Sequence, residues 1–67
     1  MSKFSEAQAA ILARDPRAWA RVADRVRQRG GSHRDVFKMI RWVHEDTGRK
    51  PPSFREFEAI MLEAERW

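Results

Sequence analysis

The chain has 67 residues, a formal net charge of +4 and no cysteine. A chain of this length forms one domain, predicted here to span residues 1–67, and its core supplies only about 3–5 kcal/mol of stability. The lack of cysteine excludes disulfides and thiolate metal sites and is typical of the reducing cytoplasm. The longest uncharged stretch, residues 7–13, is far shorter than the roughly 18 apolar residues of a membrane span, so we expect a soluble, cytoplasmic protein that is not exported.

Helical periodicity and capping signals predict four helices and no strand. The helices are expected at about residues 6–14, 16–29, 33–47 and 54–66. Ser5 and Gln8 form a Ser-x-x-Gln capping box that starts the first helix. Asp15 then caps the second helix, and Pro16 suits its first position because the N–H that proline lacks has no partner there.

Capping signals also mark the boundaries of the other two helices. Gly30 suits a left-handed C-cap after the second helix because glycine adopts that conformation without steric cost. Two more capping boxes, Ser32 with Asp35 and Ser53 with Glu56, start the third and fourth helices.

The apolar positions of these helices predict a compact all-α mini-domain of four short helices. The apolar arc of residues 33–47 is wide, and Trp42 widens it further, so we expect the third helix to be the central element of the core. Trp19 and Phe54 lie on the apolar faces of their helices, and His44 is expected to be partly buried and hydrogen-bonded. The predicted core residues are Val22, Val26, Val36, Phe37, Ile40, Val43, Phe57, Ile60 and Met61.

The stretch RVRQRGGSHRDVF, residues 25–37, admits two interpretations. As a helix-turn-helix with its turn at Gly30 and Gly31, it places the third helix in a DNA major groove. The side chains that then face DNA are Ser32, His33, Arg34, Lys38 and Arg41. If the stretch is a corner between packed helices, its arginines are solvated and Gly31 only lengthens the loop. We favour the corner, because Arg25 and Arg29 fall where the DNA-binding motif needs apolar packing.

An arginine stripe recurs at helical spacing along the second helix. The stripe consists of Arg14, Arg17, Arg21, Arg25 and Arg29. Such a stripe neutralises phosphates, meets an acidic protein surface, or is a solvated face that acids of the fourth helix partly screen. These three alternatives remain open at the level of the sequence.

Three residues are candidates for a protein-binding or self-association surface, namely Trp42, Leu62 and Trp67. Tryptophan is enriched at binding hot spots, although a small core also needs large rings. No catalytic residue is assigned, because no positioned acid–base pair or glycine-rich phosphate loop is visible. We therefore expect no enzymatic activity, cofactor, metal ion, small-molecule substrate or membrane partner.

The run DVFKMIRWVHEDTGRKPPSFREFEAIM, residues 35–61, resembles the opening helix, Gly-Pro-Pro loop and second helix of the LexA-type winged-helix DNA-binding domain. The resemblance rests on a V-F-x-x-I helix from Val36 and a T-G-x-x-P-x-S loop from Thr47, and it covers about two fifths of the chain. In that family a recognition helix and a two-stranded wing follow. No residues up to Trp67 correspond to them, so no DNA-reading residue is carried over, and the resemblance implies a trimmed scaffold.

These patterns predict a non-enzymatic binding protein. The first hypothesis is a small regulator or inhibitor, of the type carried by phages and mobile elements, that acts stoichiometrically on a larger protein partner or as a homodimer. The alternative is a DNA- or RNA-binding transcriptional regulator that uses the arginine stripe and the start of the third helix.

Overall fold

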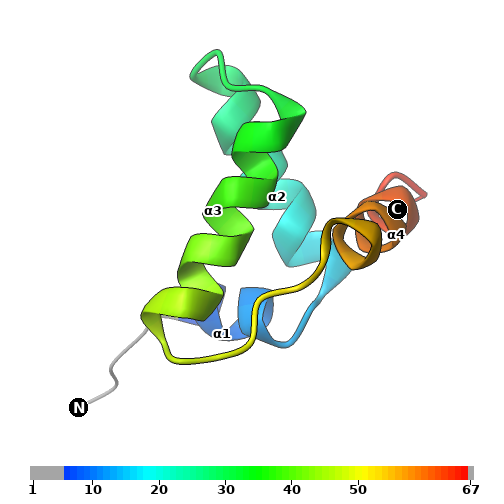
Figure 1. Ribbon diagram of the computed structural model, residues 1–67. Coiled ribbons are helices and arrows are strands. Elements are labelled where there is room, and N and C mark those ends of the chain that lie inside the picture. Colours follow the sequence, from blue (N-terminus) through cyan, green and yellow to red (C-terminus); the bar gives the residue numbers. More distant parts are fainter. Residues whose placement is uncertain (1–5, 67) are drawn as a thin grey trace.

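The computed structural model describes residues 6–66. It contains the helices α1 (Glu6–Leu12), α2 (Pro16–Gln28), α3 (His33–Asp46) and α4 (Phe54–Ala64). No strand occurs within the described range, and the predicted all-α mini-domain is confirmed. In Figure 1, α2 and α3 diverge from their short connection, and α1 lies near the open end of the pair. No helix between residues 6 and 66 has the length and apolar character that crossing a membrane requires.

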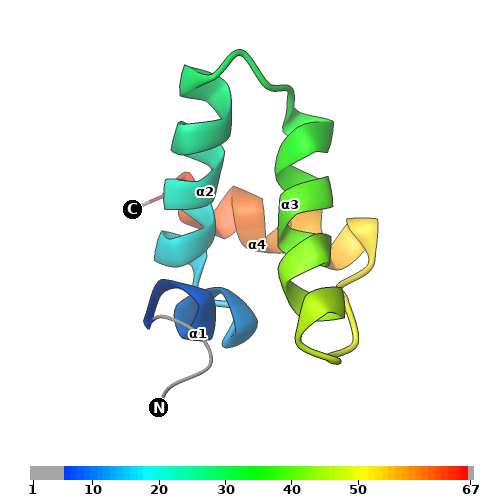
Figure 2. The same ribbon diagram turned by 90° about the vertical axis from the view of Figure 1, so that its left-hand side faces the viewer.

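The centre of the fold is α2. It packs against each of the other three helices, whereas α3 packs mainly against α1 and α2. Figure 2 shows α2 beside α3, with α4 running behind both. The prediction that the third helix is central is wrong, because its wide apolar arc is not buried throughout: Met39 and Trp42 are 44% and 55% exposed.

Trp19 of α2 joins all four helices. Its side chain is fully buried, and its Nε1–H donates a 2.9 Å hydrogen bond to the carbonyl of Ile11 in α1. The ring stacks on Phe57 of α4 with centroids 5.9 Å apart, and it meets His44 of α3 edge-on at 6.4 Å. The other buried apolar side chains are Ile11, Ala18, Ala23, Val36, Ile40, Val43, Met61 and Ala64. The core is therefore organised around one large ring on the central helix.

The predicted core is confirmed in part. The residues Val36, Ile40, Val43, Phe57 and Met61 are buried, and Val22, Val26, Phe37 and Ile60 are partly buried against them. His44 is 2% exposed and thus more deeply buried than predicted. Its Nδ1 lies 2.8 Å from the carbonyl of Ile40, whereas its Nε2 has no hydrogen-bond partner among residues 6–66. The expected hydrogen bond of His44 is therefore present at Nδ1 but not at Nε2.

The predicted N-caps of α2, α3 and α4 are confirmed. The Asp15 carboxylate accepts a hydrogen bond from the backbone N–H of Arg17. Complete capping boxes start α3 and α4, at Ser32 and Ser53 respectively. The predicted cap of the first helix, Ser5, lies outside the described residues.

The helices end slightly earlier than predicted because their last predicted residues belong to C-terminal caps. The first helix ends at Leu12, and Arg14 has a φ of 61°, a left-handed conformation that costs a non-glycine residue roughly 1–2 kcal/mol. The N–H groups of Arg14 and Asp15 return to the carbonyls of Ile11 and Ala10, as in a Schellman motif. The tight turn into the next capped helix therefore fixes the end of α1.

The Gly30–Gly31 corner is built by the same motif. Gly30 has a φ of 82°, and the N–H of Gly31 donates a 2.8 Å hydrogen bond to the carbonyl of Val26. Gly31 has a steric role and does not merely lengthen the loop, since a Cβ at this position would lie 2.4 Å from Cγ1 of Val26.

We expect Gly31→Ala to lower the free energy of unfolding by about 1–3 kcal/mol, because the added methyl group overpacks the contact with Val26. Urea denaturation followed by circular dichroism measures the effect. Gln28→Ala is the control, since Gln28 is exposed and lies on the same helix end. Equal stability of both variants and the parent chain would contradict the steric role of Gly31.

Candidate functional site

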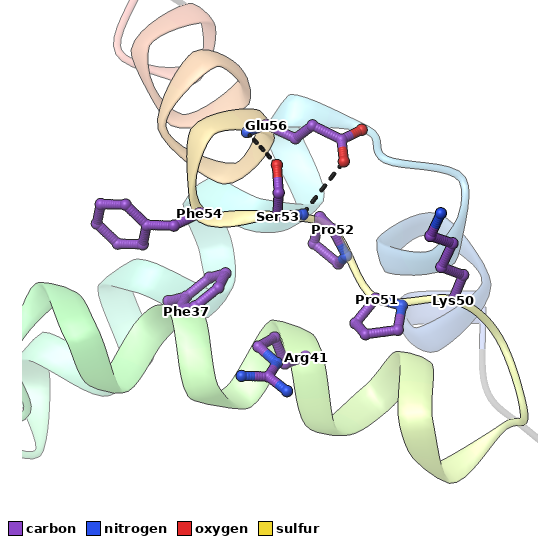
Figure 3. A pocket seen from close by; sticks show the side chains of 8 residues that line it. All are labelled: Phe37, Arg41, Lys50, Pro51, Pro52, Ser53, Phe54 and Glu56. Carbon is purple, nitrogen blue, oxygen red and sulfur yellow. Dashed lines mark hydrogen bonds between the residues drawn. The ribbon is translucent and has the colours of Figure 1, made fainter.

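A groove lies between the N-terminal half of α3 and the loop and first turn of α4 (Figure 3). One hollow of about 410 Å³ is lined by Phe37, Arg41, Lys50, Pro51, Pro52, Ser53, Phe54 and Glu56. A second hollow of about 350 Å³ is lined by Arg34, Phe37, Lys38, Arg41 and Phe54. Because both hollows share Phe37, Arg41 and Phe54, we treat them as one site. We call it the basic aromatic groove, defined by Arg34, Phe37, Lys38, Arg41, Lys50 and Phe54.

Helix α3 supplies four of these side chains from one side. Arg34, Phe37, Lys38 and Arg41 follow one another at intervals of three, one and three residues, which places them on a common face of a helix. The three cations are exposed, and Phe37 is partly buried against the core. This face therefore borders the buried face of α3 and turns toward the start of α4.

The other wall of the groove comes from Phe54 and the segment before it. Phe54 was expected on the apolar face of the fourth helix, yet it is 47% exposed, whereas Phe57 one turn later is fully buried. Its ring lies 5.1 Å from that of Phe37 in an edge-to-face arrangement. Figure 3 shows Pro51 and Pro52 on the segment that leads into this turn. Proline fixes φ, so the aromatic wall stands on a stiffened backbone.

Arg41 is held over the aromatic floor of the groove. Its guanidinium carbon lies 5.7 Å from the centroid of the Phe37 ring, within the range of a cation–π interaction. Its Nη2 also donates a 3.0 Å hydrogen bond to Glu45, one helical turn further along α3. Both contacts hold the guanidinium at the hollow and leave it solvent-accessible.

Two carboxylates beside the groove are engaged in helix caps. The backbone N–H of Ser32 donates a hydrogen bond to Asp35, and this bond lowers the pKa of Asp35. Likewise the backbone N–H of Ser53, followed by the guanidinium of Arg14, lowers the pKa of Glu56. These acids are therefore ionised at neutral pH but already paired with donors. These hydrogen bonds do not remove the negative charges: Glu56 is offset by its ion pair with Arg14, whereas Asp35 interacts electrostatically with Lys38.

We expect the Glu56→Gln variant to lose less stability than the parent chain when the pH is lowered. The folded-state pKa of Glu56 lies below its ordinary value of 4.5, so ionised Glu56 contributes stability above pH 4.5 that is lost as the pH falls through the lowered pKa. Glutamine accepts the same N–H of Ser53 but does not titrate. Thermal unfolding followed by circular dichroism between about pH 3 and pH 7 tests this. If the melting temperatures of the variant and the parent fall equally as the pH is lowered, the contribution of ionised Glu56 to stability is contradicted.

The structure divides the predicted cationic residues into separate groups. Arg34, Lys38 and Arg41 meet at the groove. Within the arginine stripe, Arg14 forms an ion pair with Glu56. The members Arg17, Arg21, Arg25 and Arg29 are exposed on or beside α2. An acid of α4 therefore pairs with the stripe at Arg14, and no ion pair from Arg21 or Arg25 to the acids of α4 occurs within residues 6–66.

His33 does not join the cations of the groove. Its Nε2 lies 2.9 Å from a carboxylate oxygen of Glu58, and its ring packs 5.1 Å from that of Phe57. It therefore ties the first turn of α3 to α4. Its neighbour Ser32 is likewise occupied in the capping box of α3.

Two of the three residues predicted to bind a protein partner are exposed. Trp42 is 55% exposed on α3, and Leu62 is 58% exposed on α4. Each projects from the side of its helix opposite the buried residues. Trp67 lies outside the described residues.

The first turn of α4 stands beside the face of α3 that carries Arg34, Phe37 and Arg41. A recognition helix needs such a face free to enter a major groove. The structure thus places these cations at a groove between two helices, and the Gly30–Gly31 segment forms the capped corner that we favoured from the sequence.

Sequence reasoning missed the aromatic half of the site. The spacing of Arg34, Phe37, Lys38 and Arg41 was readable as one helical face. Nothing in the sequence indicated that Phe54 and Lys50 would lie opposite that face.

Comparison with known proteins adds no assignment. No protein-family model matches the chain, and searches of curated proteins and of solved structures return no match. Among residues 6–66, no three histidine or acidic side chains come together as a possible metal site. The groove is therefore interpreted from its own chemistry.

Proposed function

We propose that this protein is a non-enzymatic nucleic-acid-binding protein that uses the basic aromatic groove. One observation carries the proposal. Four cations, Arg34, Lys38, Arg41 and Lys50, surround a half-exposed phenylalanine, while the carboxylates beside them are paired in caps and ion pairs.

The chemistry of nucleic acids matches both components of the groove. Lysine and arginine bind phosphates and release condensed counterions, which supplies affinity without sequence preference. Exposed aromatic rings stack on bases, and arginine adds cation–π contacts.

Fluorescence anisotropy tests the proposal directly. Purified protein is titrated into a labelled single strand of about 15 nucleotides and a labelled duplex of about 25 base pairs, at about 50 and 200 mM salt. We expect saturable binding to at least one probe, with an affinity that falls about tenfold or more between the two salt concentrations. Lack of binding to both probes at the lower salt concentration refutes the proposal.

A second candidate function is supported by a different observation. Trp42 and Leu62 remain more than half exposed, which fits the regulator or inhibitor that acts on a larger protein partner or as a homodimer. Sedimentation equilibrium of the parent chain, with Trp42→Ala and Leu62→Ala as comparisons, tests the homodimer. Affinity capture with the same variants tests the larger partner, and capture that neither substitution reduces argues against this surface.

A further inference from the structure

We infer that the basic aromatic groove receives an unpaired base of a single-stranded nucleic acid, with the flanking phosphates bound by the cations at its two ends. This inference rests on the proposed function and specifies its ligand. It makes Phe54 the stacking residue and distinguishes a single strand from a duplex.

The order of groups along the groove supports a linear ligand. Phe37 and Phe54 belong to both hollows and therefore lie where the two meet. Lys50 lines only the first hollow, whereas Arg34 and Lys38 line only the second. Glu56 also lines the first hollow, but its carboxylate is paired with Arg14. Positive charge thus lies on both sides of an aromatic centre. A single strand has the same order, since each base is attached between two phosphates.

The aromatic centre is available for stacking. Phe57, the neighbouring ring on α4, is fully buried, but Phe54 is 47% exposed. The edge-to-face contact with Phe37 and the tilted contact with Phe57, at 5.9 Å, fix the Phe54 ring from the protein side. The hollows of about 410 and 350 Å³ lie within the size range of small-ligand sites, roughly 300–1,000 Å³. A base therefore meets an ordered ring rather than a freely rotating side chain.

The walls of the groove favour an unpaired base over a duplex. In Figure 3 the segment carrying Pro51 and Pro52 faces Arg41 across the hollow, and Phe54 lies above Phe37. Bases of a duplex are stacked on their neighbours and paired, so their faces are not accessible to Phe54. A single strand exposes its bases and bends its backbone readily, which is why single-strand binders combine aromatic platforms with cationic grooves.

Substitutions of Phe54 test this inference. Phe54→Leu keeps an apolar side chain and removes the ring, while Phe54→Trp keeps a stacking surface. Trp42→Leu is the matched control, because Trp42 is an exposed aromatic residue of α3 outside the groove. Anisotropy titrations use oligothymidylate of about 15 nucleotides and a duplex of about 25 base pairs at about 50 mM salt. Circular dichroism melts verify that each variant is folded.

We expect Phe54→Leu to weaken binding of oligothymidylate about fivefold or more. Phe54→Trp and Trp42→Leu should remain within about twofold of the parent, and duplex affinity should not respond to Phe54→Leu. If the parent binds either probe but Phe54→Leu leaves oligothymidylate affinity unchanged, or weakens both probes equally, the base-stacking inference is wrong and the proposed function stands. If the parent binds neither probe, the proposed function itself fails.

Discussion

The Trp19→Ala variant is expected to be unfolded at 25 °C. Replacing a fully buried tryptophan by alanine costs about 3–5 kcal/mol, and a core of this size rarely supplies more than about 3–5 kcal/mol in total. Trp19 also contacts all three other helices, through Ile11, His44 and Phe57. Its loss opens a cavity at the point where the helices meet. The far-ultraviolet circular dichroism of the variant should therefore show a large loss of helical signal.

The control for this experiment is Trp42→Ala, the same chemical change at an exposed position. Trp42 is 55% exposed on α3, so we expect its removal to change the free energy of unfolding by about 0.5 kcal/mol or less. Urea denaturation of both variants and the parent measures the difference. A cooperative Trp19→Ala transition at the urea midpoint of the parent would show that the centre of the core lies elsewhere.

The triple variant Arg34→Gln, Lys38→Gln, Arg41→Gln is expected to lose most of its affinity for oligothymidylate. Each phosphate contact contributes about 0.7 to the slope of log affinity against log salt for a single strand, so removing three cations should reduce the slope by about 2. At about 50 mM salt this corresponds to a loss on the order of 10²–10³-fold. Anisotropy titrations at several salt concentrations give both quantities.

A matched triple variant on and directly after α2 separates local contacts from net charge. Arg21→Gln, Arg25→Gln, Arg29→Gln removes the same charge from an exposed part of the arginine stripe. None of these arginines lines either hollow, so we expect a much smaller loss and a nearly unchanged slope. If the α2 variant loses as much affinity as the groove variant, the stripe belongs to the binding surface as well.

Much of the fold was predictable because it is specified by short-range chemistry. Capping boxes such as Ser53 with Glu56 involve residues three positions apart, and their geometry does not depend on the rest of the chain. The left-handed conformation of Gly30 was predictable for the same reason. The end of α1 was not, because Arg14 adopts this conformation against its own preference.

The candidate site was predictable only in its α3 half. Arg34, Lys38 and Arg41 share a helix, so their common face follows from the helical period. Glu56 was recognisable as a capping residue, but its pairing with Arg14, 42 residues away, was not. A contact between residues so far apart in sequence depends on how the helices pack, and the hydrophobic pattern does not specify that.

The sequence by itself determined four helices, their starts and an amphipathic character, because these depend on backbone propensity and on hydrogen bonds within one turn. Only the tertiary structure decided which apolar residues are buried. Trp19 fills the centre of the core, whereas Met39 and Phe54 remain at the surface although their helical positions suited burial. The tertiary structure also brought Phe54 and Lys50 opposite the cations of α3, because packing α4 against α2 sets the position of the loop and first turn that carry them.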